Sequence, residues 1–255
     1  MPIIDRYVYA SRLRTVDPAY KAGLAVLVLL LCLLLNKPAV GLLAVGWMWG
    51  IACGLGGLSV GVFGRILLAE GLFLLLTTVG IAISVTLSPP NGTEWALQVG
   101  PLWLSSSPEA LQTVWYLITR TLGGTAALNF LALTTPMVDL VELLRRLRVP
   151  ALLIDIMTLM YRFLFTLLDS LNRMYTAQDS RLGYSNFRRG MTSAGLLGSR
   201  LFINAYQRSQ RLQIALDSRC AEGELRVLPT TYVHDRRLIG VSIAVVLTLI
   251  IAGSI

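Results

Sequence analysis

The feature that most constrains this chain is a series of apolar runs, each about as long as a helix that crosses a lipid bilayer. Such a helix needs about 20 mostly apolar residues, because each residue advances it by ~1.5 Å. Of the 255 residues, 55% are hydrophobic and 14% are charged, with a mean hydropathy of +0.67. The sequence therefore predicts an all-α polytopic membrane protein. Five runs are expected to cross the bilayer, over residues 20–36, 39–60, 64–87, 112–135 and 238–255.

The basic residues indicate how these crossings are oriented. Segment 139–237 contains 15 of the 22 basic residues, whereas the loop 88–111 contains no Lys or Arg. Basic loops are typical of the cytoplasmic side of a membrane. We therefore expect the N-terminus and segment 139–237 inside, and the loop 88–111 and the C-terminus outside. The membrane that we expect is the cytoplasmic (inner) membrane of a bacterium. The first run has no clear small-residue cleavage site, so we expect a retained helix rather than a signal peptide.

This pattern divides the chain into three parts: a transmembrane module of about four helices over residues 1–137, a cytoplasmic module of long helices over 138–237, and a last transmembrane helix over 238–255. Within the cytoplasmic module, apolar residues recur at helical spacing. The apolar stretch 151–168 contains Asp155 and Arg162. We expect it to lie against or under the membrane, in one helix with residues 169–182.

A Gly-rich linker over residues 183–198 is expected to join this helix to a second one over 199–220. Asp169 and Arg173 are four residues apart, so we expect them to pair on one helix face. The pattern alone also fits a basic amphipathic region that touches anionic lipid headgroups. That interpretation stays open beside a function in docking a partner protein.

Glycines in the second apolar run repeat at the spacing of a helix-packing face. Gly46, Gly50 and Gly54 are four residues apart, and Gly57 and Gly61 repeat the spacing. Small residues in this arrangement let helix backbones approach each other closely. The face packs either within this chain or against a partner membrane subunit.

The sequence lacks the usual signs of catalysis. The single histidine, His234, lies in a polar stretch, and no cluster has the spacing of metal ligands. No phosphate-binding G-x-x-x-x-G-K-[ST] motif and no G-x-S-x-G motif are present. Glu70 and Arg120 each lie about two turns inside an apolar run, where we expect snorkelling or single structural contacts. The three cysteines, Cys32, Cys53 and Cys220, are expected to be packing residues.

One short motif occurs twice in the cytoplasmic module. Ala177-Gln178-Asp179-Ser180-Arg181 and Ala215-Leu216-Asp217-Ser218-Arg219 share the pattern A-x-D-S-R at the expected ends of the two long helices. Two copies, 38 residues apart, predict two equivalent docking points for a pair of similar partner subunits. An arginine can hold carboxylates or carbonyls of such a partner through its planar fork.

With these motifs the chain resembles CbiQ, the cobalt-type member of the transmembrane T components of energy-coupling-factor transporters. The resemblance covers nearly the whole chain. It is carried by Ile4-Asp5-Arg6-Tyr7, Ser11-Arg12-Leu13-Arg14, Asp17-Pro18, Thr134-Thr135-Pro136, Pro150, Tyr161-Arg162, Leu182-Gly183-Tyr184, Phe187-Arg188-Arg189-Gly190 and Glu222-Gly223-Glu224-Leu225, together with both arginine motifs.

The resemblance implies a coupling function and the residues that carry it. Arg181 and Arg219 would be the central residues of two ATPase-coupling motifs, each docked in a groove of one ABC-type ATPase subunit. ATP-driven closure of the ATPase pair would then move the substrate-binding membrane subunit. Cys220 departs from the small residues that many family members have at this position. The coupling residues implied are Ser180, Arg181, Leu182, Ser218, Arg219 and Cys220, with Ala177 and Ala215 preceding them.

The resemblance also implies the partners. They are two ATPase subunits that hold ATP and magnesium, and a membrane subunit of the CbiM/CbiN type that holds cobalt. We expect no cofactor, no metal site, no nucleic-acid contact and no enzymatic activity in this chain. Three alternatives remain: the T component of an importer for nickel or another micronutrient, a stand-alone carrier or channel, and, least favoured, a membrane-embedded enzyme.

Overall fold

The computed structural model describes residues 3–35, 37–82, 84–86, 95–99, 102–106, 108–220, 232 and 236–254. They form two compact units: Pro2–Pro136 with Thr231–Ile255, and Met137–Thr230. The all-α class is confirmed, and each predicted apolar run contains a helix, although the third run, 64–87, extends beyond the end of its helix at Ala82. The elements are α1 (Ile3–Ala10), the 3-10 helix η1 (Arg12–Thr15), α2 (Pro18–Leu34), α3 (Pro38–Gly54), α4 (Val60–Ala82), β1 (Ser84–Thr86), β2 (Trp95–Val99), β3 (Leu102–Ser106), α5 (Pro108–Thr134), α6 (Met137–Arg146), α7 (Ala151–Asp179), α8 (Phe187–Asp217) and α9 (Arg236–Ser254).

Several of these helices are long and apolar enough to cross a membrane. Among the described residues, three meet this requirement, namely α4, α7 and α9, and a fourth does so if α5 and α6 count as one broken span. The helices α2 and α3 are also apolar but have 17 residues each. At ~1.5 Å per residue they are ~25 Å long, slightly shorter than a typical hydrocarbon core. The chain is thus a membrane protein, while its orientation and its number of crossings stay predictions.

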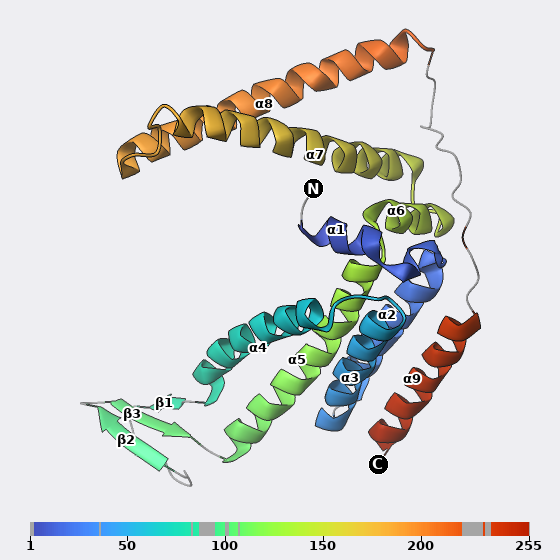
Figure 1. Cartoon of the computed structure of the whole chain (residues 1–255). Coiled ribbons are helices and arrows are strands. Elements are labelled where there is room, and N and C mark those ends of the chain that lie inside the picture. The colour runs from blue at the N-terminus through green and yellow to red at the C-terminus, as the bar shows by residue number, and fades with distance from the viewer. Residues whose placement is uncertain are drawn as a thin grey trace. The chain divides into compact units, whose positions relative to one another are not determined.

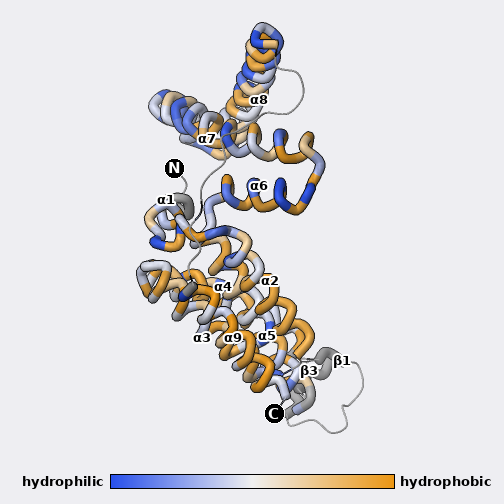
Figure 2. Tube along the Cα trace, turned by 90° about the vertical axis from the view of Figure 1, so that its right-hand side faces the viewer, coloured by the Kyte–Doolittle hydropathy of each residue, from blue (hydrophilic) through white to orange (hydrophobic). Residues whose placement is uncertain are grey.

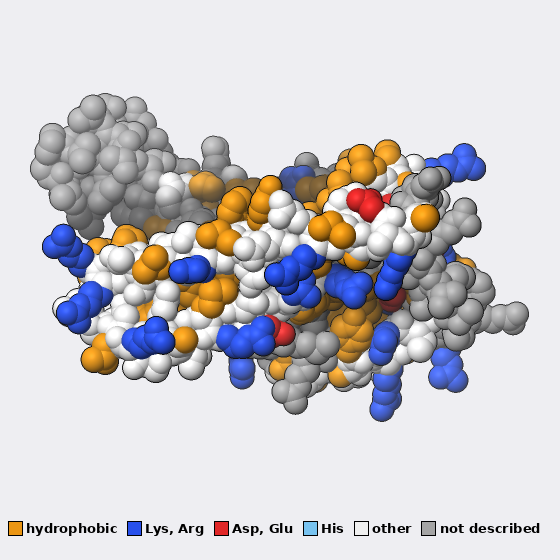
Figure 3. Space-filling view, turned by 90° about the horizontal axis from the view of Figure 1, so that it is seen from above, with side chains coloured by type: hydrophobic (Ala, Val, Ile, Leu, Met, Phe, Trp, Pro, Cys, Tyr) orange, Lys and Arg blue, Asp and Glu red, His pale blue; other side chains and the backbone are white. Residues whose placement is uncertain are grey.

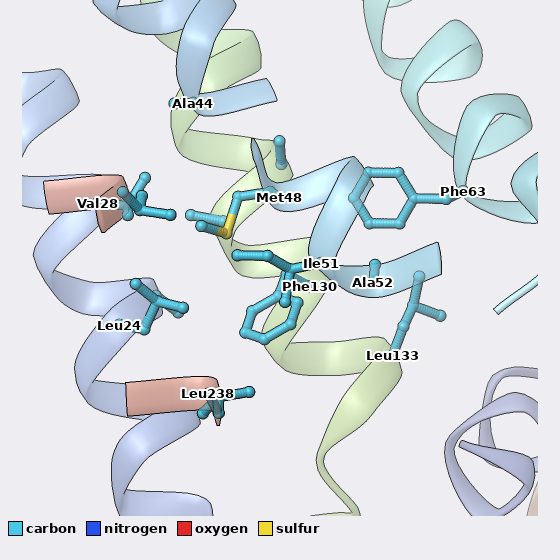
Figure 4. Close-up of a cluster of buried hydrophobic side chains, with 14 of the residues drawn as sticks. Leu24, Val28, Ala44, Met48, Ile51, Ala52, Phe63, Phe130, Leu133 and Leu238 are labelled. Carbon is cyan, nitrogen blue, oxygen red and sulfur yellow. The ribbon is translucent and has the colours of Figure 1, made fainter. Parts of the chain in front are cut away.

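The first unit is a bundle in which α2, α3, α5 and α9 lie side by side (Figure 1). Figure 2 shows that its helices are apolar along most of their length. Their shared core contains Met48 and Phe130, both fully buried, and Val28 of α2 packs with them (Figure 4). Phe63 of α4 and Leu238 of α9 pack in the same cluster, so both helices contact the bundle through it. Burial of such side chains stabilises a bundle even in lipid, because close packing replaces looser lipid contacts.

The glycines that allow close helix packing are not the ones the sequence spacing indicated. A Cβ atom added at Gly46, Gly50 or Gly54 would meet no described atom within 4 Å. A Cβ at Gly41 of α3 would instead overlap the backbone carbonyl of Thr119 in α5. The interpretation of Gly46, Gly50 and Gly54 as a packing face within this chain is therefore wrong for the described residues. Their alternative role, as a surface for a partner membrane subunit, stays a prediction.

On the α5 side of this crossing lies Gly123. A Cβ added there would come within 2.9 Å of the Gly41 Cα and 3.0 Å of the Cys32 Sγ. The spacing rule detects repeated small residues on one helix, whereas the close approach here joins single glycines from two helices. Sequence periodicity could not reveal that pairing.

The N-terminal segment is tied to the bundle by polar contacts. The Ser11 hydroxyl donates to the Gly56 carbonyl at 3.1 Å, and the Arg12 N–H donates to the same oxygen. Helix α2 then begins with Asp17, whose carboxylate accepts from the Ala19 N–H at 2.9 Å, followed by Pro18 in the first turn. Both residue types favour a helix start at this position.

Lys21 is fully buried at this end of the bundle. Its Nζ donates to the Leu13 carbonyl at 3.1 Å and to the Thr134 carbonyl at 3.2 Å. The ammonium therefore joins η1, α2 and the last turn of α5. A buried lysine is tolerated only where such acceptors replace water.

Replacing Lys21 with methionine is expected to lower the thermal unfolding midpoint of the detergent-solubilised protein. Methionine has a similar length but donates no hydrogen bond, so the Thr134 carbonyl loses a charged partner, at a cost of about 2–3 kcal/mol. Lys37, the other lysine, is partly exposed and makes no side-chain capping bond, so Lys37→Met is the matched control. Equal midpoints for the two variants would contradict a structural role for Lys21.

A small antiparallel sheet follows α4, in the order β1-β3-β2. Val85 pairs with Leu104, and Leu97 pairs with the same residue from the other side. Two of the strands, β2 and β3, lie in the segment 88–111, which was predicted to be a loop. The third, β1, lies at the end of the predicted membrane run 64–87, so the prediction of a helix to residue 87 is wrong there.

The second unit contains α6 and two long helices, α7 and α8, that run antiparallel (Figure 1). Helix α7 is continuous from Ala151 to Asp179, which confirms that residues 151–168 and the following turns form one helix. Helix α8 begins at Phe187 rather than near residue 199, so the predicted linker 183–198 is mostly helix. The expected Asp169–Arg173 ion pair is absent from the contacts of the described residues.

Two of the glycines in that supposed linker lie near a tight turn instead. A Cβ at Gly183 would come within 2.8 Å of both the Gln178 carbonyl and the Ser193 Oγ. The Ser193 hydroxyl donates to the Gly183 carbonyl at 2.9 Å, and Gly190 lies against Tyr184. Close approach of the chain around the α7–α8 turn, rather than flexibility, accounts for Gly183, whereas a Cβ at Gly190 would make only an ordinary contact, 3.8 Å from Tyr184.

Candidate functional site: two equivalent helix ends

The two A-x-D-S-R motifs end α7 and α8 in the same way. Asp179 and Asp217 are the last helical residues, and the cap residues Ser180 and Ser218 have nearly equal backbone angles, with φ of −61° and −66°. Each serine hydroxyl donates to the alanine carbonyl three residues before it. The distances are 3.1 Å for Ser180 to Ala177 and 3.0 Å for Ser218 to Ala215.

The backbone hydrogen bonds repeat as well. The Arg181 N–H donates to the Gln178 carbonyl at 3.1 Å, and the Arg219 N–H donates to the Leu216 carbonyl at 3.0 Å. The next N–H in each copy donates to the aspartate carbonyl, at 2.9 Å for Leu182 and 3.1 Å for Cys220. The sequence repeat is therefore also a structural repeat.

The residue after each arginine has a left-handed backbone conformation. The φ angle is +57° at Leu182 and +50° at Cys220, and among the described non-glycine residues only Arg148 shares this feature. Such a conformation costs an L-residue with a Cβ about 1–2 kcal/mol. Both side chains are exposed, Leu182 at 68%, so burial in this chain does not offset the cost. Strained, exposed positions of this kind are typical of functional sites.

Both arginines are exposed at these helix ends, and neither side chain forms a hydrogen bond or ion pair with the described residues. Because α7 and α8 run antiparallel, the two arginines lie near opposite ends of the hairpin (Figure 1). Helix α8 has 31 residues, so it is ~45 Å long at ~1.5 Å per residue. The unit thus presents two similar cationic tips, far enough apart to contact two separate protein domains.

The first tip is braced by aromatic residues. The Tyr184 and Tyr175 rings have centroids 4.9 Å apart, and the Tyr184 hydroxyl donates to the Gln178 side chain at 2.8 Å. The Gly183 N–H also donates to the Gln178 carbonyl, which completes a Schellman-type helix end. These contacts fix the backbone that carries Arg181. Residues 221–231, which follow Cys220 directly, lie outside the described part of the chain.

The arginines and their repeat could be predicted from the sequence, but the left-handed residues could not. Helix ends most often have glycine at the left-handed position, and nothing in residue type marks leucine or cysteine for it.

Both ionisable residues inside the apolar runs have partners. The Asn129 side-chain amide lies 2.9 Å from both Glu70 carboxylate oxygens and joins α5 to α4. The Arg120 Nη2 donates to the Leu33 carbonyl at 2.7 Å and joins α5 to α2. Each side chain thus makes a local contact between helices, in keeping with the structural interpretation.

Side chains that typically bind metal ions do not gather in the described residues. No group of three or more His, Cys, Asp or Glu side chains lies together there in a way that could hold a metal ion. His234 lies outside the described residues. Of the cysteines, Cys32 is buried, Cys53 is partly buried and Cys220 is exposed, so the packing interpretation does not fit Cys220.

Comparison with known families gives a match across both units. The family model described as "CbiQ: Cobalt transport protein" matches residues 11–229, which include both arginine motifs. The chain belongs to the CbiQ family of cobalt transport proteins. Family membership and the apolar helices together account for a membrane protein of a transport system rather than an enzyme.

Individual CbiQ relatives support this assignment. The chain is 29% identical over 226 residues to the cobalt transport protein CbiQ of Salmonella typhimurium, covering 88% of this chain and 99% of the relative. It is 37% identical over 157 residues to CbiQ of Rhodobacter capsulatus, covering 62% and 64%. A protein of Methanocorpusculum labreanum, named as a fused cobalt transport protein CbiMQ, is 28% identical over 224 residues. That match covers 87% of this chain, which spans only 37% of the fused relative's length.

Proposed function

We propose that this chain is the transmembrane coupling subunit of an energy-coupling-factor importer for cobalt ions. It transmits ATP-driven movement of two ABC-type ATPase subunits to a metal-binding membrane subunit. The observation that carries the proposal is the structural repeat: two helices of one unit end in the same cap, each with an exposed arginine and a left-handed residue after it.

Each part of the repeated cap has a role in this proposal. The arginine fork binds carboxylates or carbonyls in an ATPase groove, which suits its five donors in a fixed plane. The left-handed residue directs the chain away from the helix axis, so its side chain projects beside the arginine. Leu182 offers an apolar contact and Cys220 a smaller one, and partner burial offsets the strain that both carry.

Two parts of the proposal, that cobalt is the substrate and that a CbiM-type subunit is the partner, are supported by the family and its relatives. The family description and the Salmonella and Rhodobacter relatives name cobalt transport, and the fused relative's name joins an M part to a Q part in one polypeptide. We infer that cobalt is held by that partner, and ATP with magnesium by the ATPase subunits. The T component of a nickel or other micronutrient importer remains the alternative.

The proposal is tested by tagging this chain and purifying it from cells that also express the neighbouring ATPase and membrane subunits. Both partners are expected to co-purify, and cobalt is expected with the membrane subunit rather than with this chain. Purified chain that carries cobalt alone, or that moves cobalt across liposomes without an ATPase, would contradict the proposal and favour a stand-alone carrier.

Leu182→Asn is expected to weaken capture of the ATPase about tenfold while the thermal unfolding midpoint stays unchanged. Asparagine tolerates the left-handed conformation better than leucine, so the helix end is retained and only the apolar contact is lost. The matched control is Leu196→Asn, because Leu196 is 54% exposed within α8 and away from both caps. Equal capture by the two variants would show that Leu182 makes no contact with the ATPase.

A further inference from the structure

Helices α7 and α8 form a second candidate binding site, which plays no part in the proposed coupling function. A cavity of about 430 Å³ lies between them. Three arginines line it, Arg162 from α7 and Arg208 and Arg211 from α8, together with the amides of Asn204 and Gln207. No acidic side chain is among the residues that line it.

These arginines lack counter-charges in the described part of the chain. The side chains of Arg162 and Arg211 form no hydrogen bond or ion pair with any described residue. The Arg208 guanidinium lies over the Phe163 ring, 5.7 Å from its centroid, which holds the side chain at the cavity. Three like charges at one cavity repel each other, and an anion placed among them would relieve that repulsion.

The acidic residues of the two helices do not serve as that anion. Helix α8 contains a single acidic residue, Asp217, which accepts a hydrogen bond from Gln213 four residues away, near the end of the helix. On α7, Asp155 and Asp169 are each seven residues from Arg162 and Asp179 ends the helix, and none of the three lines the cavity. The charge imbalance is therefore local to the cavity.

We propose that this cavity binds the phosphate group of an anionic membrane lipid. Guanidinium groups bind phosphate oxygens in bidentate fashion, and the two side-chain amides supply further donors. The inference stands apart from ATPase docking, because the cavity contains neither arginine of the two caps. The proposal also names a specific site for the contact with anionic lipid headgroups that the basic amphipathic sequence pattern indicated.

Apolar side chains that line the cavity favour a lipid over soluble phosphate. Leu159 and Phe163 from α7 and Leu212 from α8 lie there beside the arginines. In Figure 3, orange hydrophobic side chains lie among the blue Lys and Arg side chains, and few are red. Acyl chains would cover such apolar surface while the headgroup binds the arginines.

The experiment compares lipid binding by the full-length chain in detergent micelles. The probe is dioleoylphosphatidylglycerol, with dioleoylphosphatidylcholine as the zwitterionic comparison, and bound lipid is counted by native mass spectrometry. The wild type is expected to retain the anionic lipid preferentially. Arg162→Gln with Arg211→Gln is expected to weaken its binding about thirtyfold, equivalent to about 1 kcal/mol for each arginine.

The matched control is Arg188→Gln with Arg200→Gln. It removes the same net charge from α8 at exposed positions outside the cavity. Preserved binding in this control, with loss in the cavity variant, supports the site. Equal losses in both variants, or equal retention of both lipids by the wild type, would overturn it.

Two further measurements determine which anion binds in the cavity. Excess inorganic phosphate is expected to leave the bound lipid in place, because it lacks acyl chains. Displacement by phosphate that then binds the wild type but not the cavity variant would still support the phosphate site, with a soluble occupant. If the cavity variant lost capture of the ATPase while lipid binding stayed unchanged, the proposal would be overturned in favour of a protein carboxylate.

Discussion

Cells that carry Arg181→Glu together with Arg219→Glu are expected to lose ATP-dependent cobalt uptake, to the level of cells without this chain. Each glutamate places a negative charge where the proposal requires a guanidinium, so attraction to the ATPase groove becomes repulsion. Loss of a buried, hydrogen-bonded charge at an interface costs about 2–5 kcal/mol, and here it occurs at both contacts. Radioactive cobalt uptake in whole cells is the direct measurement.

The chain itself is expected to fold and insert normally in this variant. Both arginines are exposed, and their side chains form no hydrogen bond or ion pair with any described residue, so little of the fold depends on them. Arg188→Glu with Arg200→Glu is the control, since it makes the same change of charge at exposed positions of α8. Arg181→Lys is expected to retain part of the uptake, because lysine keeps the charge but not the planar fork. Near-normal uptake in the double glutamate variant would exclude docking through these residues.

The second large effect is expected at the crossing of α3 and α5. Gly41→Ala adds a single methyl group that would overlap the Thr119 carbonyl oxygen and lie 2.6 Å from its carbon. Both are backbone atoms, so the helices must separate. Overpacking of this kind costs about 1–3 kcal/mol. The thermal unfolding midpoint in detergent is therefore expected to fall, and the yield of folded protein with it.

Gly50→Ala provides the comparison on the same helix. The added methyl would meet no described atom within 4 Å, and alanine favours a helix over glycine by about 0.5–1 kcal/mol. This variant is expected to be as stable as the wild type or slightly more stable. An equal loss of stability in Gly50→Ala and Gly41→Ala would contradict this packing, in which Gly41 contacts α5 and Gly50 contacts no other helix.

The helical part of the fold could be predicted because a helix that crosses a bilayer needs a long run of apolar residues. Such a run is visible in the sequence without any knowledge of tertiary contacts. The runs that begin near Tyr20 and end near Ile255 needed no partner to be recognised. Pairings between distant segments could not be predicted in this way. Gly41 meets Thr119, and Lys21 reaches Thr134, through contacts that depend on how helices cross rather than on periodicity.

The candidate site was partly predictable for a related reason. A repeated pentapeptide is visible in sequence, so Arg181 and Arg219 were found. The left-handed conformations of Leu182 and Cys220 and the cavity around Arg208 arise only from folded geometry. The start of α8 was placed too late because Gly190, Gly195 and Gly198 suggested a linker. Gly190 lies against Tyr184 at the turn, and the structure gives no contact that explains Gly195 or Gly198.

The central claim, that the two caps dock on ATPase subunits, is tested most directly by cross-linking from the caps themselves. Cys220 is exposed next to Arg219 and supplies a natural thiol, and Leu182→Cys places a second thiol beside Arg181. A thiol-reactive photo-crosslinker would be attached at each position in turn in membranes that contain the complete transporter. We predict adducts with the ATPase from both positions and protection of both thiols from impermeant reagents outside intact cells. Labelling from outside, or adducts with lipid alone, would contradict the account.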